Sequence, residues 1–257
     1  MTAIVKWAPP YQPPCPSSNV SFGSATGDGP TPILPCNRSS VVVYRSSDGG
    51  THWRFLSVLA DALEYPESHE GPNEHDMTVL PDGKTLLAVV RLDGGDGGRK
   101  PPLEPYYYLP YHRCLSTDWG KTWSRLTPIP NTGCARPRLL TVGWKVLLTG
   151  GRFRVYHNTS DVLLWVSYDG VGEEWTPYSL SYHHNLGATE RRDIVPFDWK
   201  VNASNTSNLG PRETNGYTSI VQLNSSSAIV FYDQKSGSAT HTQYHTQLIS
   251  YSMVVHV

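Results

Sequence analysis

A short turn motif occurs three times in this chain and limits the folds that the chain can adopt. The second copy matches the pattern S-x-D-x-G-x-T-W fully, the first has His at the seventh place, and the third has one extra residue before its Trp; the copies are Ser46–Trp53, Ser116–Trp123 and Ser167–Trp175. In such a turn the Asp and Ser side chains bond back to turn amides, Gly takes a positive φ, and the Trp ring is buried as the next strand begins. The repeat therefore predicts a hairpin turn in each of three successive units.

Apolar segments typical of β-strands flank every copy of this turn. They precede the three copies at 41–46, 111–116 and 163–167 and follow them at 53–59, 123–129 and 175–180. Two further strands are expected before the second copy, at 77–83 and 85–91, and before the third, at 137–143 and 145–151. A last unit without an Asp turn has strands at 217–223, 227–234 and 247–257. Four antiparallel strands per unit are typical of a propeller blade.

The spacing of the turns sets the expected number of blades. Asp118 follows Asp48 by 70 residues, and Asp169 follows Asp118 by 51. At roughly 60 residues per blade, 257 residues form about four blades. We expect one all-β domain, a partial propeller, with these parts: a partial blade with the first Asp turn at 1–60, blades at 74–128 and 134–183, an insertion at 185–213 and a last blade at 215–257.

Composition excludes several classes of function. The formal net charge is -1 and 17% of the residues are charged, which argues against a nucleic-acid partner. No apolar run reaches the roughly 18 residues of a membrane span. The 10 His residues and 4 Cys residues show no ligand spacing, so neither a metal nor another cofactor is expected. His183, His184, His241 and His245 lie in polar, loop-like sequence and are expected at the surface.

The compartment is indicated by sequons. Six Asn residues stand in N-x-S/T, at positions 19, 37, 158, 202, 205 and 224, where about two are expected by chance. We interpret the chain as a secreted or lumenal glycoprotein without its own signal peptide; the alternative is a Ser-rich chain whose sequons are unused. The four Cys residues, at 15, 36, 114 and 134, allow three pairings, and the sequence leaves open whether disulfides form.

Blade geometry separates structural residues from candidate site residues. In a four-stranded meander the start of the first strand and the end of the second share one edge, which we call the mouth edge, and the Asp turns lie at the opposite edge. The aspartates of the repeats, Asp48, Asp118 and Asp169, are therefore expected to be structural. At the mouth edge stand Glu74, Arg91, Arg152 and Tyr217.

The segments NEHDMTVLPDGKTLLAVVR and NGYTSIVQLNSSSAIVFYDQ, with the full Asp turn between them, resemble the second half of the exo-α-sialidases, which are six-bladed propellers. The resemblance covers roughly residues 40–257. It implies that Tyr217 is the nucleophile, that Glu74 accepts the proton of Tyr217, and that Arg91 and Arg152 hold the substrate carboxylate. Arg154 is an alternative to Arg152.

These residue types suit the substrate. Sialic acid carries a carboxylate on its anomeric carbon, which repels a carboxylate nucleophile, so a neutral phenol is the better attacking group. The planar fork of Arg matches a carboxylate with two parallel bonds. The predicted partners are sialylated glycans.

Two parts of the sialidase pattern are missing. No Arg-Ile-Pro motif occurs, and Asp28, the one aspartate before the first Asp turn, stands in a turn-like context that does not fit the family's general acid. We therefore expect Met1 to be an internal methionine of a longer protein and the chain to be a poor catalyst as it stands. The alternatives are a catalytically inactive sialidase-like propeller that binds glycans or serves a structural role, and an Asp-turn propeller unrelated to sialic acid.

Overall fold

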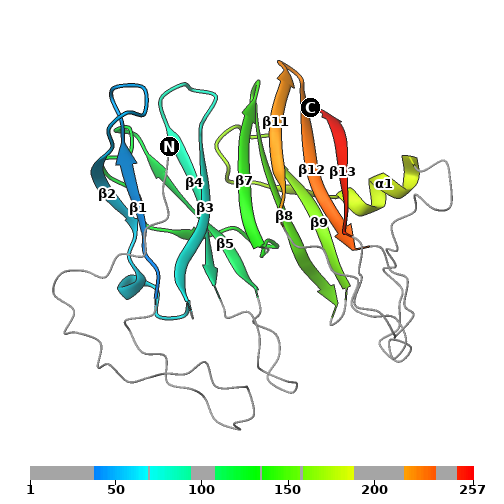
Figure 1. Ribbon diagram of the computed structural model, residues 1–257, viewed down its shortest axis with the longest axis horizontal. Coiled ribbons are helices and arrows are strands. Elements are labelled where there is room, and N and C mark those ends of the chain that lie inside the picture. Colours follow the sequence, from blue (N-terminus) through cyan, green and yellow to red (C-terminus); the bar gives the residue numbers. More distant parts are fainter. Residues whose placement is uncertain are drawn as a thin grey trace, which may run out of the picture. The chain divides into compact units, whose positions relative to one another are not determined.

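The strands belong to antiparallel sheets, as the sequence predicts. The computed structural model describes residues 38–68, 70–93, 108–133, 135–156, 159–187, 217–235 and 248–257, but only the backbone of 93, 108, 152–156, 159, 160, 234, 235, 248 and 249. The chain is all-β and has the fold of an incomplete propeller. Its strands form several antiparallel sheets (Figure 1). It divides into two compact units, Met1–Asn73 with Leu92–Leu109, and Glu74–Arg91 with Pro110–Val257.

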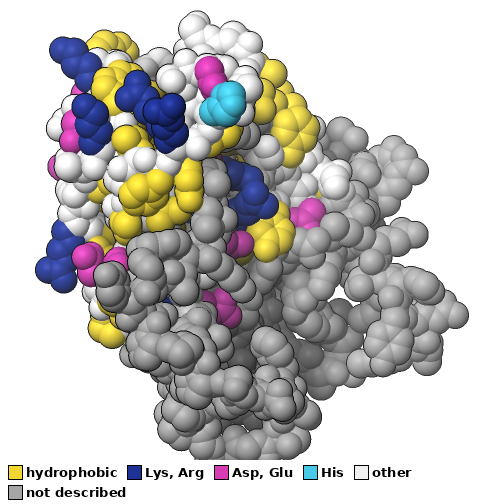
Figure 2. Space-filling view, turned by 60° about the vertical axis from the view of Figure 1, so that its left-hand side comes forward, with side chains coloured by type: hydrophobic (Ala, Val, Ile, Leu, Met, Phe, Trp, Pro, Cys, Tyr) yellow, Lys and Arg dark blue, Asp and Glu magenta, His cyan; other side chains and the backbone are white. Residues whose placement is uncertain are grey.

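The first unit holds a two-stranded sheet. Strand β1 (Val41–Arg45) pairs antiparallel with β2 (Arg54–Ala60), and a single 3-10 turn, η2 (Ala62–Glu64), follows. The run of valines that opens β1 is buried, whereas Phe55 and Val58 of β2 are exposed. On the side of the molecule that carries these strands, exposed hydrophobic side chains lie among Lys and Arg (Figure 2).

Three sheets lie wholly or mainly in the second unit. The first has the order β3-β4-β5-β6, with β3 at Gly71–Val79, β4 at Leu86–Asp93, β5 at Tyr108–Ser116 and β6 at Thr127–Pro128. The next has β7 (Ala135–Val142), β8 (Lys145–Tyr156), β9 (Thr159–Ser167) and β10 (Thr176–Ser179) in sequence order. The last has β11 (Ser219–Asn224), β12 (Ser227–Lys235) and β13 (Leu248–His256). Sequential pairing of this kind is the meander of a propeller blade.

Two apolar cores lie between consecutive blades of this unit. One contains Leu87, Val89 and Tyr111 of the β3–β6 blade together with Leu148 and Trp165 of the next blade. The other joins residues of β7–β10 to Ala228, Val230 and Tyr232 of β12. The inner strands also meet: Thr78 Oγ1 on β3 lies 3.1 Å from Thr141 Oγ1 on β7, and β11 contacts β7. The first strand of each blade therefore lies beside the first strand of the next.

The Asp turns have the predicted internal bonds. Gly120 N donates to Ser116 Oγ at 2.8 Å, Thr122 N to Asp118 Oδ1 at 2.9 Å, and Thr122 Oγ1 to Asp118 Oδ2 at 2.6 Å. In the first copy the ring of His52 takes the place of that hydroxyl, with Nδ1 2.6 Å from Asp48 Oδ2. These bonds lower the pKa of both Asp48 and Asp118 to about 2. The structural role expected for these carboxylates is thus visible in their contacts.

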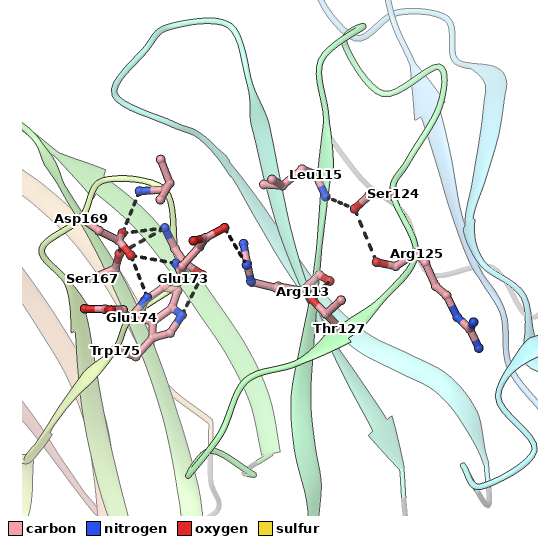
Figure 3. Close-up of polar contacts among 12 residues, drawn as sticks. Arg113, Leu115, Ser124, Arg125, Thr127, Ser167, Asp169, Glu173, Glu174 and Trp175 are labelled. Atoms are coloured by element: carbon pink, nitrogen blue, oxygen red, sulfur yellow. Dashed lines mark hydrogen bonds and ion pairs between the residues drawn. The ribbon is translucent and has the colours of Figure 1, made fainter.

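The third Asp turn also connects two blades. Its Asp169 accepts bonds from the backbone of Glu173 and Glu174, while the carboxylate of Glu173 reaches Arg113 Nη2 on β5 at 3.2 Å (Figure 3).

Strand β6 has only two residues, although a strand is predicted over 123–129. The Ser124 side chain, rather than a main-chain carbonyl, accepts from Leu115 N, and Pro128 and Pro130 have no N–H for the ladder. For these reasons β6, the fourth strand of the β3–β6 blade, is short.

Two further expectations require correction. Trp53 is not buried but 40% exposed, and its indole N–H donates to Gly50 O at 2.9 Å. His183 and His184 are not in a loop but in helix α1 (Leu180–Gly187), where His184 is half-buried with Nδ1 2.8 Å from Tyr232 Oη. The other pair, at 241 and 245, lies outside the described residues. Cys114, whose pairing the sequence leaves open, is a buried free thiol, and burial raises its pKa to about 12.

No helix in the described part of the chain has the length and apolar character needed to cross a membrane.

Candidate active site

The predicted carboxylate and one predicted arginine form an ion pair at the mouth edge of the β3–β6 blade. Glu74 lies on β3 and Arg91 near the end of β4, because the β3–β4 hairpin returns the chain to the edge where β3 begins. Arg91 Nη1 donates to Glu74 Oε2 at 2.8 Å, and the exposed fractions of the two side chains are 6% and 17%. A charge-assisted bond with so little water around it fixes the position of the carboxylate.

The same carboxylate oxygen also bonds to the next inner strand. Arg136 N donates to Glu74 Oε2 at 2.8 Å. The ladder between β7 and β8 shifts register between Ala135 and Arg138, and Arg136 has a φ of 28°. Such an irregularity takes a residue out of the ladder and redirects its amide and side chain, and Pro137 has no N–H for the ladder. The irregular start of β7 therefore brings the Arg136 amide to Glu74.

A second carboxylate on β3 repeats this connection two residues along. Asp76 Oδ2 accepts a bond from Leu139 N at 3.0 Å and lies 3.9 Å from Arg138 Nη1. Glu74 and Asp76 share one side of β3 because side chains alternate along a strand. The two acidic residues together hold β7 against β3 at the mouth edge.

Tyr217 joins the cluster from the last blade. Thr218 Oγ1 lies 2.7 Å from Thr149 Oγ1 on β8, and both threonines are buried, which anchors the start of β11 to the preceding blade. Tyr217, the residue before Thr218, is 47% exposed. The Arg136 guanidinium carbon lies 5.5 Å from the centroid of its ring, within range of a cation–π interaction. Arg136 thus contacts Glu74 with its backbone and Tyr217 with its side chain.

The structure brings together three of the four predicted site residues. A further residue, Arg136, which sequence reasoning missed, takes part in their contacts. Arg91 pairs with Glu74, and Arg136 connects Glu74 to Tyr217. Arg152 and the alternative, Arg154, lie on β8, but their side chains are outside the described residues. Arg136 had a usable signal, because it stands at the start of the first strand of its blade, equivalent to Glu74 and Tyr217 in theirs.

The arrangement offers a carboxylate acceptor, an exposed phenol and an exposed guanidinium at one edge. Within the described ranges, no group of three His, Cys, Asp or Glu side chains is placed to hold a metal ion. The described side chains at this edge thus comprise a carboxylate held by two N–H donors, an exposed phenol and an exposed guanidinium.

Several solved structures are similar to this chain. An α-L-arabinanase from Penicillium chrysogenum matches with a TM-score of 0.52 and 15% identity, over 84% of this chain and 54% of that one. An α-L-arabinofuranosidase from Fusarium graminearum matches with a TM-score of 0.51 and 15% identity, over the same shares. A sialidase from Trypanosoma rangeli matches with a TM-score of 0.46 and 14% identity, over 84% and 27%.

The matches to the first two enzymes show the propeller fold, and the chain spans about half the length of each. No family model and no curated protein sequence matches the chain.

Proposed function

We propose that this chain carries part of the active site of a propeller glycoside hydrolase, an exo-α-sialidase that releases terminal sialic acid with retention of configuration. In this proposal Tyr217 is the nucleophile, Glu74 is its base, and Arg91 and Arg152 hold the substrate carboxylate. The observation that supports it most is the continuous contact from Glu74 through Arg136 to Tyr217 at the mouth edge. The resemblance of the sequence to sialidases supports the choice of sugar.

The proposed reaction has two steps. The Tyr217 hydroxyl attacks the anomeric carbon, its proton passes to Glu74, and the glycosidic C–O bond breaks as the aglycone leaves with a proton from an acid. Water then attacks the glycosyl–tyrosine intermediate and gives a proton to the conjugate base of that acid, the C–O bond to Tyr217 breaks, and Glu74 returns its proton to the phenolate as sialic acid is released. The proposal assigns the acid to no residue of this chain. A general acid contributes about 10² to 10⁴ in rate, so substrates with good leaving groups suit the chain best.

A second candidate is a glycan-binding propeller without hydrolytic activity. The buried ion pair of Arg91 with Glu74 favours this reading, because an arginine that is 5% exposed and already bonded to a carboxylate offers less of its fork to a substrate. In this reading the exposed groups, Tyr217 and Arg136, bind the sugar and the glycosidic bond remains intact. The proposed partners, sialylated glycans, and the proposed secreted or lumenal location are the same for both candidates.

The test compares two nitrophenyl glycosides, an α-sialoside and an α-L-arabinofuranoside, whose leaving group needs little protonation. We expect hydrolysis of the sialoside and a fall of at least about 100-fold in kcat for Tyr217→Phe, because the variant has no nucleophilic oxygen. An unchanged rate in the variant, or hydrolysis of the arabinofuranoside alone, would contradict the proposal. Binding of the sialoside without hydrolysis would support the second candidate.

A further inference from the structure

One sequon, Asn224-Ser225-Ser226, lies within the described residues, in the hairpin that joins β11 to β12. Asn224 is the last residue of β11 and pairs with Ser227, so only Ser225 and Ser226 form the turn. The first and second strands of a blade join at the edge opposite the mouth edge. A group attached to Asn224 would therefore lie away from the candidate active site.

The turn fixes the side-chain amide of Asn224. Its Oδ1 accepts bonds from Ser226 N at 2.9 Å and from Ser226 Oγ at 3.2 Å. A backbone N–H donates only to an acceptor, so the atom of the amide that meets it is the oxygen. In the described part of the chain no acceptor bonds to Nδ2, and the residue is exposed to solvent. Nδ2, the atom that N-glycosylation modifies, is therefore accessible.

An exposed indole lies on the neighbouring hairpin. The tips of the β7–β8 and β11–β12 hairpins meet, since a Cβ placed on Gly143 would lie 3.4 Å from Ser225 O. Trp144, the next residue, is 78% exposed, more than any other large apolar side chain in the described ranges. Its backbone packs closely against the third Asp turn, where a Cβ on Gly170 would lie 2.9 Å from Trp144 O. The hairpin thus holds a large apolar ring in water, which is unfavourable unless another group covers it.

We propose that Asn224 carries an N-linked glycan and that the first sugars of this glycan pack on the indole of Trp144. In the modification, Nδ2 forms a bond to the anomeric carbon of a lipid-pyrophosphate oligosaccharide. The bond from that carbon to the pyrophosphate oxygen breaks, and the lipid pyrophosphate leaves with the proton lost from Nδ2.

The chemistry of a glycan suits this position. The C–H groups of a pyranose form an apolar face that fits an aromatic ring, while the hydroxyls of the sugar stay in water. The contact between the two hairpin tips places the attachment point and the ring on adjacent turns. Occupancy requires passage through the secretory pathway, as proposed, but it does not require catalysis.

The test compares two serine variants with the unaltered protein, all secreted from a eukaryotic host behind an added signal peptide. Ser226→Ala removes the hydroxyl that the sequon requires, whereas the matched control, Ser225→Ala, leaves an intact sequon in the same turn. Glycopeptide mass spectrometry gives the occupancy of Asn224. Hydroxyl-radical footprinting gives the oxidation rate of Trp144, with Trp119 as the internal reference because it is 53% exposed on another Asp turn.

We expect a glycan on Asn224 in the unaltered protein and in Ser225→Ala, and none in Ser226→Ala. One face of a ring is about half of its accessible surface, so Trp144 should be oxidised about 2-fold faster in Ser226→Ala, with Trp119 unchanged. Enzymatic removal of the glycan from the unaltered protein should give the same rise without a substitution.

Three results would overturn the inference, and none of them bears on the proposed reaction. An unaltered protein without a glycan on Asn224 would show that the sequon is not used. A glycosylated Asn224 with equal oxidation of Trp144 in all three proteins would show that the glycan does not pack on the indole. Faster oxidation of both Trp144 and Trp119 in Ser226→Ala would show a loosened fold in place of an uncovered ring.

Discussion

Arg91 Nη1 lies 2.8 Å from Glu74 Oε2, in a pair that is almost shielded from solvent. The same oxygen accepts the amide of Arg136 from the next inner strand. These two bonds hold the start of β7 in place. In the proposed reaction the same carboxylate accepts the proton of Tyr217.

The first prediction concerns this pair. Glu74→Gln leaves the buried Arg91 without its counter-charge, and breaking such a pair costs about 3 kcal/mol in free energy of unfolding, measured by denaturant titration. Glu173→Gln is the control, because Glu173 is 63% exposed in its pair with Arg113 and should lose about 0.5 kcal/mol. Equal losses in the two variants would show that burial of the Glu74 pair does not contribute as described.

A second prediction concerns the full Asp turn. The bonds from Thr122 hold the pKa of Asp118 at about 2, below its ordinary 3.8, so the unfolded state binds more protons between these values. The stabilisation is complete above about pH 4 and is lost as the pH falls toward 2. Asp118→Asn should therefore lower the Tm at pH 7, with a difference that shrinks below pH 4. A difference in Tm that stays constant from pH 7 to pH 2 would show that the ionised Asp118 carboxylate is not the source of the stabilisation.

The third prediction concerns the buried Asp161, which is 1% exposed near Ser179 and Ser181. Burial raises its pKa above 3.8, so the folded state binds more protons than the unfolded state between 3.8 and the raised value. The stability contributed by this group is present below pH 3.8 and falls as the pH rises through that window. Asp161→Asn should accordingly raise the Tm at pH 7 and have a smaller effect at pH 4. A lower Tm at pH 7 would show that the charged form is required.

A fourth prediction compares two glycines of the Asp turns. A Cβ at Gly172, whose φ is +72°, would lie 2.7 Å from Leu87 Cδ2, whereas a Cβ at Gly49, with a φ of +70°, would meet nothing within 4 Å. Gly49→Ala should lower the free energy of unfolding by about 1 kcal/mol, because alanine is unfavourable at a positive φ. Gly172→Ala should cost about 2 kcal/mol more, because it also displaces a core side chain. If chemical denaturation gave the same loss of free energy of unfolding for both variants, the contact with Leu87 would not contribute as described.

The fold was predictable from the sequence because its signals are local. An Asp turn between two apolar segments specifies a hairpin whatever surrounds it, and the bonds of Asp118 and Asp48 are made within four residues. Strand lengths were less predictable where side chains intervene, as Ser124 does beside β6. Helix α1 was missed because its packing depends on residues distant in sequence, such as Tyr232, which contacts His184.

The candidate site was predictable only in part. Edge geometry identified Glu74, Arg91 and Tyr217 as residues of one edge, since that inference needs only the order of strands. The position of Arg136 at the start of a first strand follows from the same strand order, but its contacts do not, because they depend on an irregular start of β7 and on a positive φ that nothing in the run ARPRLL requires. The pairing of Arg91 with Glu74, in contrast to an arginine open to substrate, likewise depends on side-chain packing.

The central claim is that Tyr217 forms a covalent bond with the anomeric carbon of sialic acid. A 3-fluorosialosyl fluoride tests it directly, because fluoride leaves without protonation and the second fluorine slows hydrolysis of the intermediate. The account predicts an adduct on the peptide that contains Tyr217, detected by mass spectrometry after digestion, and none in Tyr217→Phe. An adduct on Glu74 or another residue, or no adduct on a protein that binds the compound, would contradict it.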